Sequence, residues 1–204
     1  MYQVPHFKAE HEQQVFDFME QNPFVVICGV NEHQQPVATH VPILIEWRND
    51  QLFLLGHIMR KQDHTNIFEK NNQVLVIFSG HHSYVSATNY AEQNTASTWN
   101  YKAVHASGNL KFLDEAALLN LLTKLTKHFE NNEQSPALVE KMKPEYIQPM
   151  LKAIVAFEIK VTALDHVFKL SQNKDEATKK KVIQQLENDK NPLADDMKNF
   201  YKKD

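Results

Sequence analysis

The sequence has little glycine and little cysteine. It contains four glycines and one cysteine among 204 residues. A P-loop, a G-x-G-x-x-G fingerprint and a G-x-S-x-G nucleophile elbow are all missing, and so few glycines could hardly supply them. Nothing in the sequence therefore argues for a hydrolase. The single cysteine, Cys28, lies in the apolar run FVVICGV and cannot form an internal disulfide, so we expect it to be a small buried hydrophobic residue.

Long hydrophobic runs and an excess of charge of either sign are also missing. No apolar run approaches the length of a membrane span, and the first residues lack the apolar core of a signal peptide. The formal net charge of −3 gives no global attraction to nucleic acid or to a membrane. With 42% hydrophobic and 23% charged residues, we expect a globular, cytoplasmic protein.

What the sequence does contain is a series of strand-like segments. Continuous apolar or alternating stretches predict strands over residues 24–30, 36–47, 51–58, 74–80, 83–90, 98–112 and 153–170. Because Pro42 lies inside the second of these, that strand should be an edge strand or bulged near this point. The pattern indicates an α+β, mainly β protein built on a small closed antiparallel barrel, with a sandwich as the alternative.

Helical periodicity surrounds these strands. It predicts peripheral helices over residues 9–22, 116–130 and roughly 137–151, and a short helix within 60–73. Asp114 is the expected N-cap of the helix over 116–130, and Thr65 or Asp63 that of the short helix. Residues 173–204 form a charged extension, predicted to be a helical hairpin broken at Asn191-Pro192, which follows a main domain over 1–172.

The stretch TWNYKAVHASG, at residues 98–108, alternates between two faces. Trp99, Tyr101 and His105 share one face with Ser107, so this face combines large aromatic rings with an imidazole and a hydroxyl. Such a face suits the wall of a site for a flat polar ligand. A packing surface or a dimer interface, where Trp and Tyr are also enriched, is the alternative.

A second group of polar residues follows two earlier strands. Thr39 and His40 lie mid-strand, where a barrel core would favour apolar residues. His57, Arg60 and Lys61 lead into the short helix. Cationic side chains beside a helix N-terminus are suited to a phosphate group, although Arg60 and Lys61 could equally be ordinary surface charges.

The histidines do not form a recognisable metal site. There are eleven, but the adjacent pair His81-His82 points to opposite faces of a strand, and no His-x-x-x-His or Cys-His cluster occurs. No spacing selects a catalytic triad either. What remains is a polar and aromatic pocket beside a phosphate site, a combination that suits a protein whose chemistry belongs to a bound cofactor.

Several segments together resemble a known family. They are FKAEHEQQVFDFMEQNPF, PVATHVPILIE, GHIMRK, YVSATNY, TWNYKAVHASG and FKLSQNK, in this order, between about residue 1 and about residue 190. The sequence resembles the PaiB family of FMN-binding proteins, usually described as negative transcriptional regulators. The family has the split β-barrel that is shared with pyridoxamine phosphate oxidase and flavin reductase-like proteins.

This resemblance implies a homodimer that holds FMN in a cleft between two barrels. The residues implied to contact the cofactor form three groups: Thr39, His40 and Pro42 along the flavin, His57, Arg60 and Lys61 at the phosphate, and Trp99, Asn100, Tyr101 and His105 along the wall. The late motif KLSQN, at residues 169–173, is implied to be structural or near the site. The resemblance assigns no catalytic and no metal-binding residue.

Three functions are compatible with this assignment. The leading one is an FMN-binding negative transcriptional regulator, for which DNA binding rests on the family description alone. The second is an FMN-dependent oxidoreductase or flavin reductase-like enzyme. The third is haem binding, because some split-barrel relatives hold haem and this chain is rich in histidine.

Overall fold

The computed structural model describes residues 1–90 and 95–202. The strands form one seven-stranded sheet with the order β2-β1-β5-β6-β7-β4-β3. A single sheet rules out the sandwich alternative. The chain divides into two compact units: a first unit of Met1–Met19, Ser79–Val104 and Asp165–Asp204, and a second unit of Glu20–Phe78 and His105–Leu164. β5 (Gln73–Val85), β6 (Thr98–Phe112) and β7 (Ile154–Lys169) contribute residues to both units.

The second unit contains most of the antiparallel ladder. β1 (Phe24–Val30) and β4 (Gln51–Met59) occupy the predicted segments, and β1 pairs with β2 on one side and β5 on the other. β4 pairs with β3 and β7. Buried residues alternate along these strands, because one face of each packs into the core.

The predicted strand over residues 36–47 is in fact two strands. β2 (Pro36–Pro42) and β3 (Leu44–Arg48) lie at opposite ends of the strand order, although only Ile43 separates them in the chain. Pro42 has no N–H for a ladder bond, and the N–H of Ile43 donates instead to the carbonyl oxygen of Pro23 at 3.0 Å. The chain thus leaves one edge of the sheet at Pro42 and starts the other edge, which brings the two edges together.

Two further expectations need correction. The segments 74–80 and 83–90, predicted as separate strands, form the single strand β5, followed by a 3₁₀ turn at Ala87–Asn89. The short helix α2 (Asp63–Lys70) is capped by neither Asp63 nor Thr65. Thr65 is buried, and its hydroxyl donates to the carbonyl oxygen of Met59 at 2.6 Å, so it ties the helix to the end of β4 instead.

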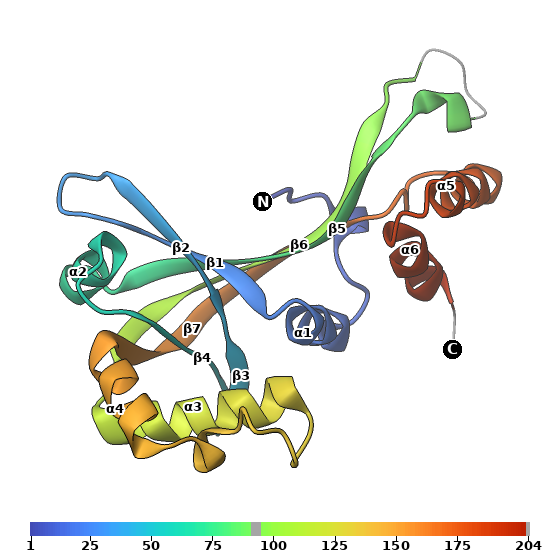
Figure 1. Ribbon diagram of the computed structural model, residues 1–204. Coiled ribbons are helices and arrows are strands. Elements are labelled where there is room, and N and C mark those ends of the chain that lie inside the picture. Colours follow the sequence, from blue (N-terminus) through green and yellow to red (C-terminus); the bar gives the residue numbers. More distant parts are fainter. Residues whose placement is uncertain (91–94, 203–204) are drawn as a thin grey trace. The chain divides into compact units, whose positions relative to one another are not determined.

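Two helices cover part of the second unit, and Figure 1 shows them side by side. α3 (Glu115–Glu130) begins as predicted, with the carboxylate of Asp114 accepting the N–H of Ala117 at 2.8 Å. The helix expected over 137–151 is a 3₁₀ turn at Val139–Lys141 followed by α4 (Pro144–Ala153). The two helices share a buried cluster with β4 and β7: Leu55, Leu118, Leu121, Leu125, Leu151 and Ala156.

The first unit contains α1 (Glu12–Gln21) for most of its length, and the predicted helical hairpin. The hairpin consists of α5 (Glu176–Asn188) and α6 (Leu193–Tyr201), with the break at Asn191-Pro192. Its buried core is Val85, Leu170, Val182, Leu186, Leu193, Ala194 and Met197.

The domain boundary between residues 172 and 173 stays a prediction. Within the described residues, no helix is long and apolar enough to cross a membrane.

Candidate functional site

The turn between β4 and α2 carries two cations predicted to serve a phosphate. Arg60 and Lys61 are both exposed, and neither forms an ion pair within the described residues. The turn itself is fixed, because the N–H of Arg60 donates to the carbonyl oxygen of Ala153 at 2.8 Å and Lys61 has a φ of 58°. Two exposed cations therefore stand directly before the first turn of α2, in which the carboxylate of Asp63 accepts the N–H of His64 at 2.7 Å.

His57 lies three residues before this pair of cations, on β4. Its ring is half-buried, and its Nδ1 is buried without a hydrogen-bond partner in the described residues. Burial lowers the pKa of His57, so the ring is neutral near pH 7. A buried polar atom without a partner costs roughly 1–3 kcal/mol. A ligand that supplied this partner would recover that cost.

The predicted residues of β2 point to two different faces. Thr39 pairs with Ile27 and His40 with Val26, and neighbouring residues of a strand alternate in direction. Thr39 is half-buried, whereas His40 is exposed and its ring stacks on Phe24 at 6.1 Å between ring centroids. Pro42 lies on the same face of β2 as His40. A ligand on this face would meet His40 and Pro42 but not Thr39.

Phe24 was not among the predicted residues. Its side chain is 64% exposed, more than any other large hydrophobic residue of the described chain. The only sequence signal is its position as the first apolar residue after Pro23, and the cross-strand register that places it beside His40 could not be read from the sequence.

In the first unit, Trp99 belongs to a cluster of exposed rings. Its side chain is 53% exposed and lies 5.9 Å from the ring of His82 and 6.1 Å from that of Tyr84, both on β5. Tyr101, on the same face of β6, is half-buried, and burial raises its pKa. The alternation predicted for β6 is confirmed. The cluster offers aromatic surface to a planar molecule.

Asn100 lies on the opposite face of β6 and is fully buried. Its Nδ2 donates to the Oγ of Ser171 at 2.8 Å, while its Oδ1 is buried without a partner in the described residues. Lys169 donates to the hydroxyl of Thr98, and the Gln172 side chain accepts the N–H of Leu170 at 2.7 Å. The KLSQN motif is thus bonded to the TWN motif, which gives it a structural role.

The predicted residues are divided between the two units. Trp99, Asn100 and Tyr101 belong to the first unit, and the remainder belong to the second: Thr39, His40, Pro42, His57, Arg60, Lys61 and His105. His105 is half-buried on β6. Within the described residues, no group of three or more His, Cys, Asp or Glu residues is arranged to hold a metal ion.

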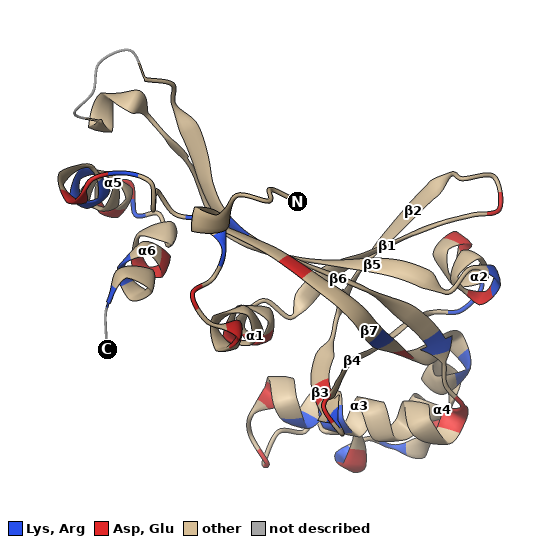
Figure 2. Ribbon diagram, turned by 180° about the vertical axis from the view of Figure 1, so that it is seen from behind, with Lys and Arg blue, Asp and Glu red and all other residues tan. Residues whose placement is uncertain are grey.

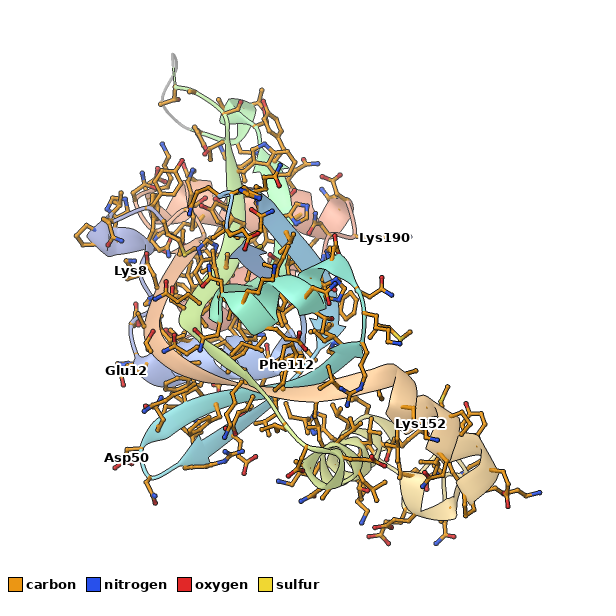
Figure 3. The ribbon with its side chains drawn as sticks, turned by 90° about the vertical axis from the view of Figure 1, so that its left-hand side faces the viewer. Lys8, Glu12, Asp50, Phe112, Lys152 and Lys190 are labelled. Carbon is orange, nitrogen blue, oxygen red and sulfur yellow. The ribbon has the colours of Figure 1, made fainter. Side chains whose placement is uncertain are left out.

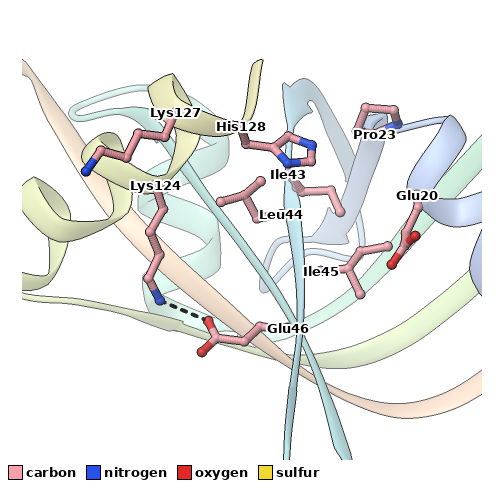
Figure 4. Close-up of a pocket in the computed structure, with 9 residues that line it drawn as sticks. All are labelled: Glu20, Pro23, Ile43, Leu44, Ile45, Glu46, Lys124, Lys127 and His128. Carbon is pink, nitrogen blue, oxygen red and sulfur yellow. Dashed lines mark ion pairs between the residues drawn. The ribbon is translucent and has the colours of Figure 1, made fainter. Parts of the chain in front are cut away.

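A cavity of about 630 Å³ lies elsewhere in the second unit, between the end of α1, the start of β3 and α3 (Figure 4). Ile43, Leu44 and Ile45 line it with apolar surface, and Lys124 forms an ion pair with Glu46 at 3.5 Å. The remaining lining residues are Glu20, Pro23, Lys127 and His128. None of the predicted residues lines this cavity. The acidic and basic side chains of its lining are equal in number, so the lining does not favour an anionic or a cationic ligand.

Cys28 is half-buried rather than fully buried. Burial raises its pKa, so the side chain is a thiol and not a reactive thiolate. It lines an open cavity of about 680 Å³ on β1, β5 and β6 with small neutral groups such as Ser107 and Asn109. The expected structural role of Cys28 remains a prediction.

The antiparallel sheet, the edge-to-edge passage at Pro42 and the peripheral helices define an α+β split barrel. The family model described as "Putative FMN-binding domain" matches residues 1–163, and the chain belongs to this family. It is 34% identical over 197 residues to "Protease synthase and sporulation protein PAI 2" of Bacillus subtilis strain 168, covering 97% of this chain and 94% of that protein. The PaiB resemblance is thereby confirmed.

Solved structures share the fold. The flavocytochrome Anf3 from Azotobacter vinelandii has a TM-score of 0.59 at 14% identity, covering 83% of this chain and 72% of its own. The FAD and haem binding protein from Mycobacterium smegmatis has a TM-score of 0.56 at 14% identity, covering 79% and 72%. At this level of identity, the likeness concerns the fold alone.

Proposed function

We propose that the protein is an FMN-binding homodimer that acts as a negative transcriptional regulator in the cytoplasm. The observation that carries the FMN assignment is the free pair Arg60 and Lys61 at the start of α2, three residues after the unpartnered Nδ1 of His57. Membership of a family described as FMN-binding supports the same assignment.

The residues present fit the two halves of FMN. Its phosphate dianion suits the cations of Arg60 and Lys61. The flat isoalloxazine ring suits exposed aromatic surface. Each unit offers one such surface, His40 with Phe24 in the second unit and Trp99 with Tyr84 in the first. When bound, the flavin would supply redox chemistry. The chain's residues would hold its phosphate, orient its ring and keep water from it.

The other predicted residues would act at a distance from the ring. Thr39 lies on the inner face of β2, and Asn100 on the buried face of β6, so we propose that both support the strands that carry the contacting side chains. The side chain of Tyr101 points to the same face of β6 as that of Trp99 and would extend the aromatic surface in the first unit.

The proposed dimer is supported by an apolar outer sheet face in the second unit. On β1 and β5, the residues that alternate with the core are also apolar and only half-buried: Val26, Cys28, Val30, Leu75 and Ile77. An antiparallel sheet face in contact with water normally carries polar residues, and a strand apolar on both faces is normally covered on both. A second copy of the chain, bound through the same strands, would cover this face.

The test of the FMN and dimer assignments uses the purified full-length chain. Its absorption spectrum should show the flavin bands, and mass spectrometry of the heat-released molecule should identify FMN. Sedimentation velocity should give twice the chain mass of 23.7 kDa. A colourless protein that binds no added FMN, or a monomer at micromolar concentration, would contradict the respective part of the proposal.

The proposed regulatory role is supported by the similarity to the PaiB family. Figure 2 shows both basic and acidic residues on α5 and α6. DNA binding would depend on the dimer. A mobility-shift titration on the protein's own upstream region, with and without FMN, tests it, and binding that falls steeply with salt is expected for phosphate contacts.

Two other functions are favoured by particular observations. The neutral, half-buried His57 beside the proposed phosphate position would suit an FMN-dependent oxidoreductase, which rapid reduction of bound flavin by NAD(P)H would reveal. Haem binding is named in the description of the Mycobacterium smegmatis neighbour, and the exposed ring of His82 beside Trp99 is the ligand that we propose for it here. A Soret band lost in the His82→Ala variant would favour haem.

A further inference from the structure

The first nine residues of the chain lie along the end of β7 within the first unit. Phe7 is 8% exposed, and the 3₁₀ turn Pro5–Phe7 holds it in place. Every polar contact of this segment with β7 is made to two consecutive residues, Asp165 and His166. We call residues 1–9 the strap; Lys8, near its end, is labelled in Figure 3.

One contact of the strap requires a neutral imidazole. The backbone N–H of Ala9 donates to the Nε2 of His166 at 2.9 Å. An imidazole nitrogen accepts a hydrogen bond only when it carries no proton, so the ring must be neutral with its proton on Nδ1. Protonation of His166 would turn the acceptor into a donor that faces another donor.

The other contacts gather on the carboxylate of Asp165. Lys8 Nζ lies 2.6 Å from its Oδ1 and also donates to the carbonyl oxygen of His166 at 2.8 Å. Gln3 donates to Oδ2 at 3.0 Å, and the amino group of Met1 lies 3.6 Å from the same atom. The Asp165 carboxylate is therefore the counter-ion that holds the strap.

The strap covers a lysine next to the candidate site. The rings of Tyr2 and Phe7 lie 5.9 and 5.6 Å from Lys169 Nζ, and this ammonium donates to the hydroxyl of Thr98, the residue before Trp99. Burial lowers the pKa of Lys169, in keeping with an ammonium that is shielded from water.

We propose that residues 1–9 are an acid-released strap over Lys169, opened by the uptake of one proton at His166. Opening would expose the Lys169 ammonium, the Thr98 hydroxyl and the ring of Phe7 beside the aromatic cluster of Trp99. The proposal uses only contacts within the first unit, so it holds or fails independently of FMN binding.

Burial and the two charged groups next to His166 act on its pKa in opposite directions, and the lowering effects are the larger ones. His166 is faced by Lys8 and Asp165 and packs against the ring of Phe168 at 5.6 Å. Burial and Lys8 lower the pKa of His166 and the Asp165 carboxylate raises it, with a net lowering. Lys8 lowers the pKa of Asp165. His166 and Asp165 therefore both bind a proton more readily when the strap is released than when it is closed. Closure is thus favoured above the free-histidine pKa of about 6.5 and is lost as the pH falls, with Asp165 adding to the loss below about pH 4.

Amide hydrogen exchange followed by NMR tests this on the full chain between pH 5 and pH 7.5. The protection factor of the Ala9 amide should be constant above about pH 6.5 and fall below it, by at most about tenfold per pH unit, as one proton requires. The amide of Val104, buried in the same unit, should keep its protection throughout.

Two variants distinguish protonation of His166 from a general unfolding of the protein at acid pH. His166→Gln keeps a neutral acceptor and should abolish the pH dependence at Ala9, while His33→Gln, at an exposed turn, should leave it unchanged. Protection at Ala9 that is independent of pH in the wild type, or that falls equally in His166→Gln, or that falls together with Val104, would overturn the proposal.

Discussion

The Nζ of Lys102 lies 2.6 Å from the Oδ1 of Asp196, and this ion pair ties β6 to α6. The Lys102 side chain is only 12% exposed, and its ammonium lies over the rings of Phe18 and Phe168. His81 Nδ1 contacts the other carboxylate oxygen at 2.9 Å. The C-terminal hairpin therefore supplies the counter-ion of a cation buried among aromatic rings, and its acidic residues are more than a solvated surface.

Asp196→Asn should lower stability markedly, because it leaves the Lys102 ammonium buried without its counter-ion. Breaking one partner of a buried pair costs about 3–5 kcal/mol, and the small remaining exposure of this pair places the expected loss at the lower end, near about 3 kcal/mol. Urea denaturation measures it. The double variant Lys102→Met with Asp196→Leu should recover most of the loss, and Asp189→Asn, on an exposed residue, should lose almost nothing. A loss that persists in the double variant would assign the effect to something other than the charge.

Trp99→Ala should weaken FMN binding without affecting the fold. Stacking of aromatic rings contributes about 0.5–1.5 kcal/mol, so the dissociation constant should rise roughly two- to twelvefold. The melting temperature of the FMN-free protein should change little, because the ring is half exposed. Trp47→Ala is a matched control, since Trp47 is 50% exposed on β3 and outside both groups of predicted residues. Equal effects of the two substitutions on FMN affinity would remove Trp99 from the site.

Asn100→Ala should lower stability rather than FMN affinity. It removes the buried hydrogen bond to Ser171 and leaves that hydroxyl without its donor, a loss of about 1–3 kcal/mol. Asn109→Ala, on an exposed position of the same strand, should be nearly neutral. If Asn100→Ala kept the wild-type melting temperature but lost FMN, then Asn100 would contact the cofactor directly, against its position on the buried face.

The long regular elements could be predicted because their periodicity is strong. The strands over residues 24–30 and 98–112 agree with the structure to the residue, and Asp114 caps its helix as expected. The edge position predicted from Pro42 is confirmed, because β2 and β3 are the two edge strands of the sheet. Local patterns failed where tertiary contacts decided. Residues 36–47 form two strands instead of one, and Thr65 bonds to the end of β4 instead of capping α2.

The candidate site could be predicted only in part. Strand alternation already separates Asn100 from Trp99 and Thr39 from His40, although the family resemblance grouped them. The neighbours of these residues depend on cross-strand register, which a single sequence does not contain. Phe24 beside His40, and Tyr84 beside Trp99, therefore emerged only from the structure.

The affinity of the double variant Arg60→Ala with Lys61→Ala for FMN, measured by calorimetry, tests the central claim most directly. Each charge-assisted hydrogen bond to the phosphate contributes about 1.5–3 kcal/mol, so the dissociation constant should rise at least about a hundredfold. Riboflavin, which lacks the phosphate, should bind both proteins equally. Lys111→Ala with Lys180→Ala removes the same charge from exposed positions and should bind FMN like the wild type. Unchanged FMN affinity in the Arg60 and Lys61 variant would contradict the account.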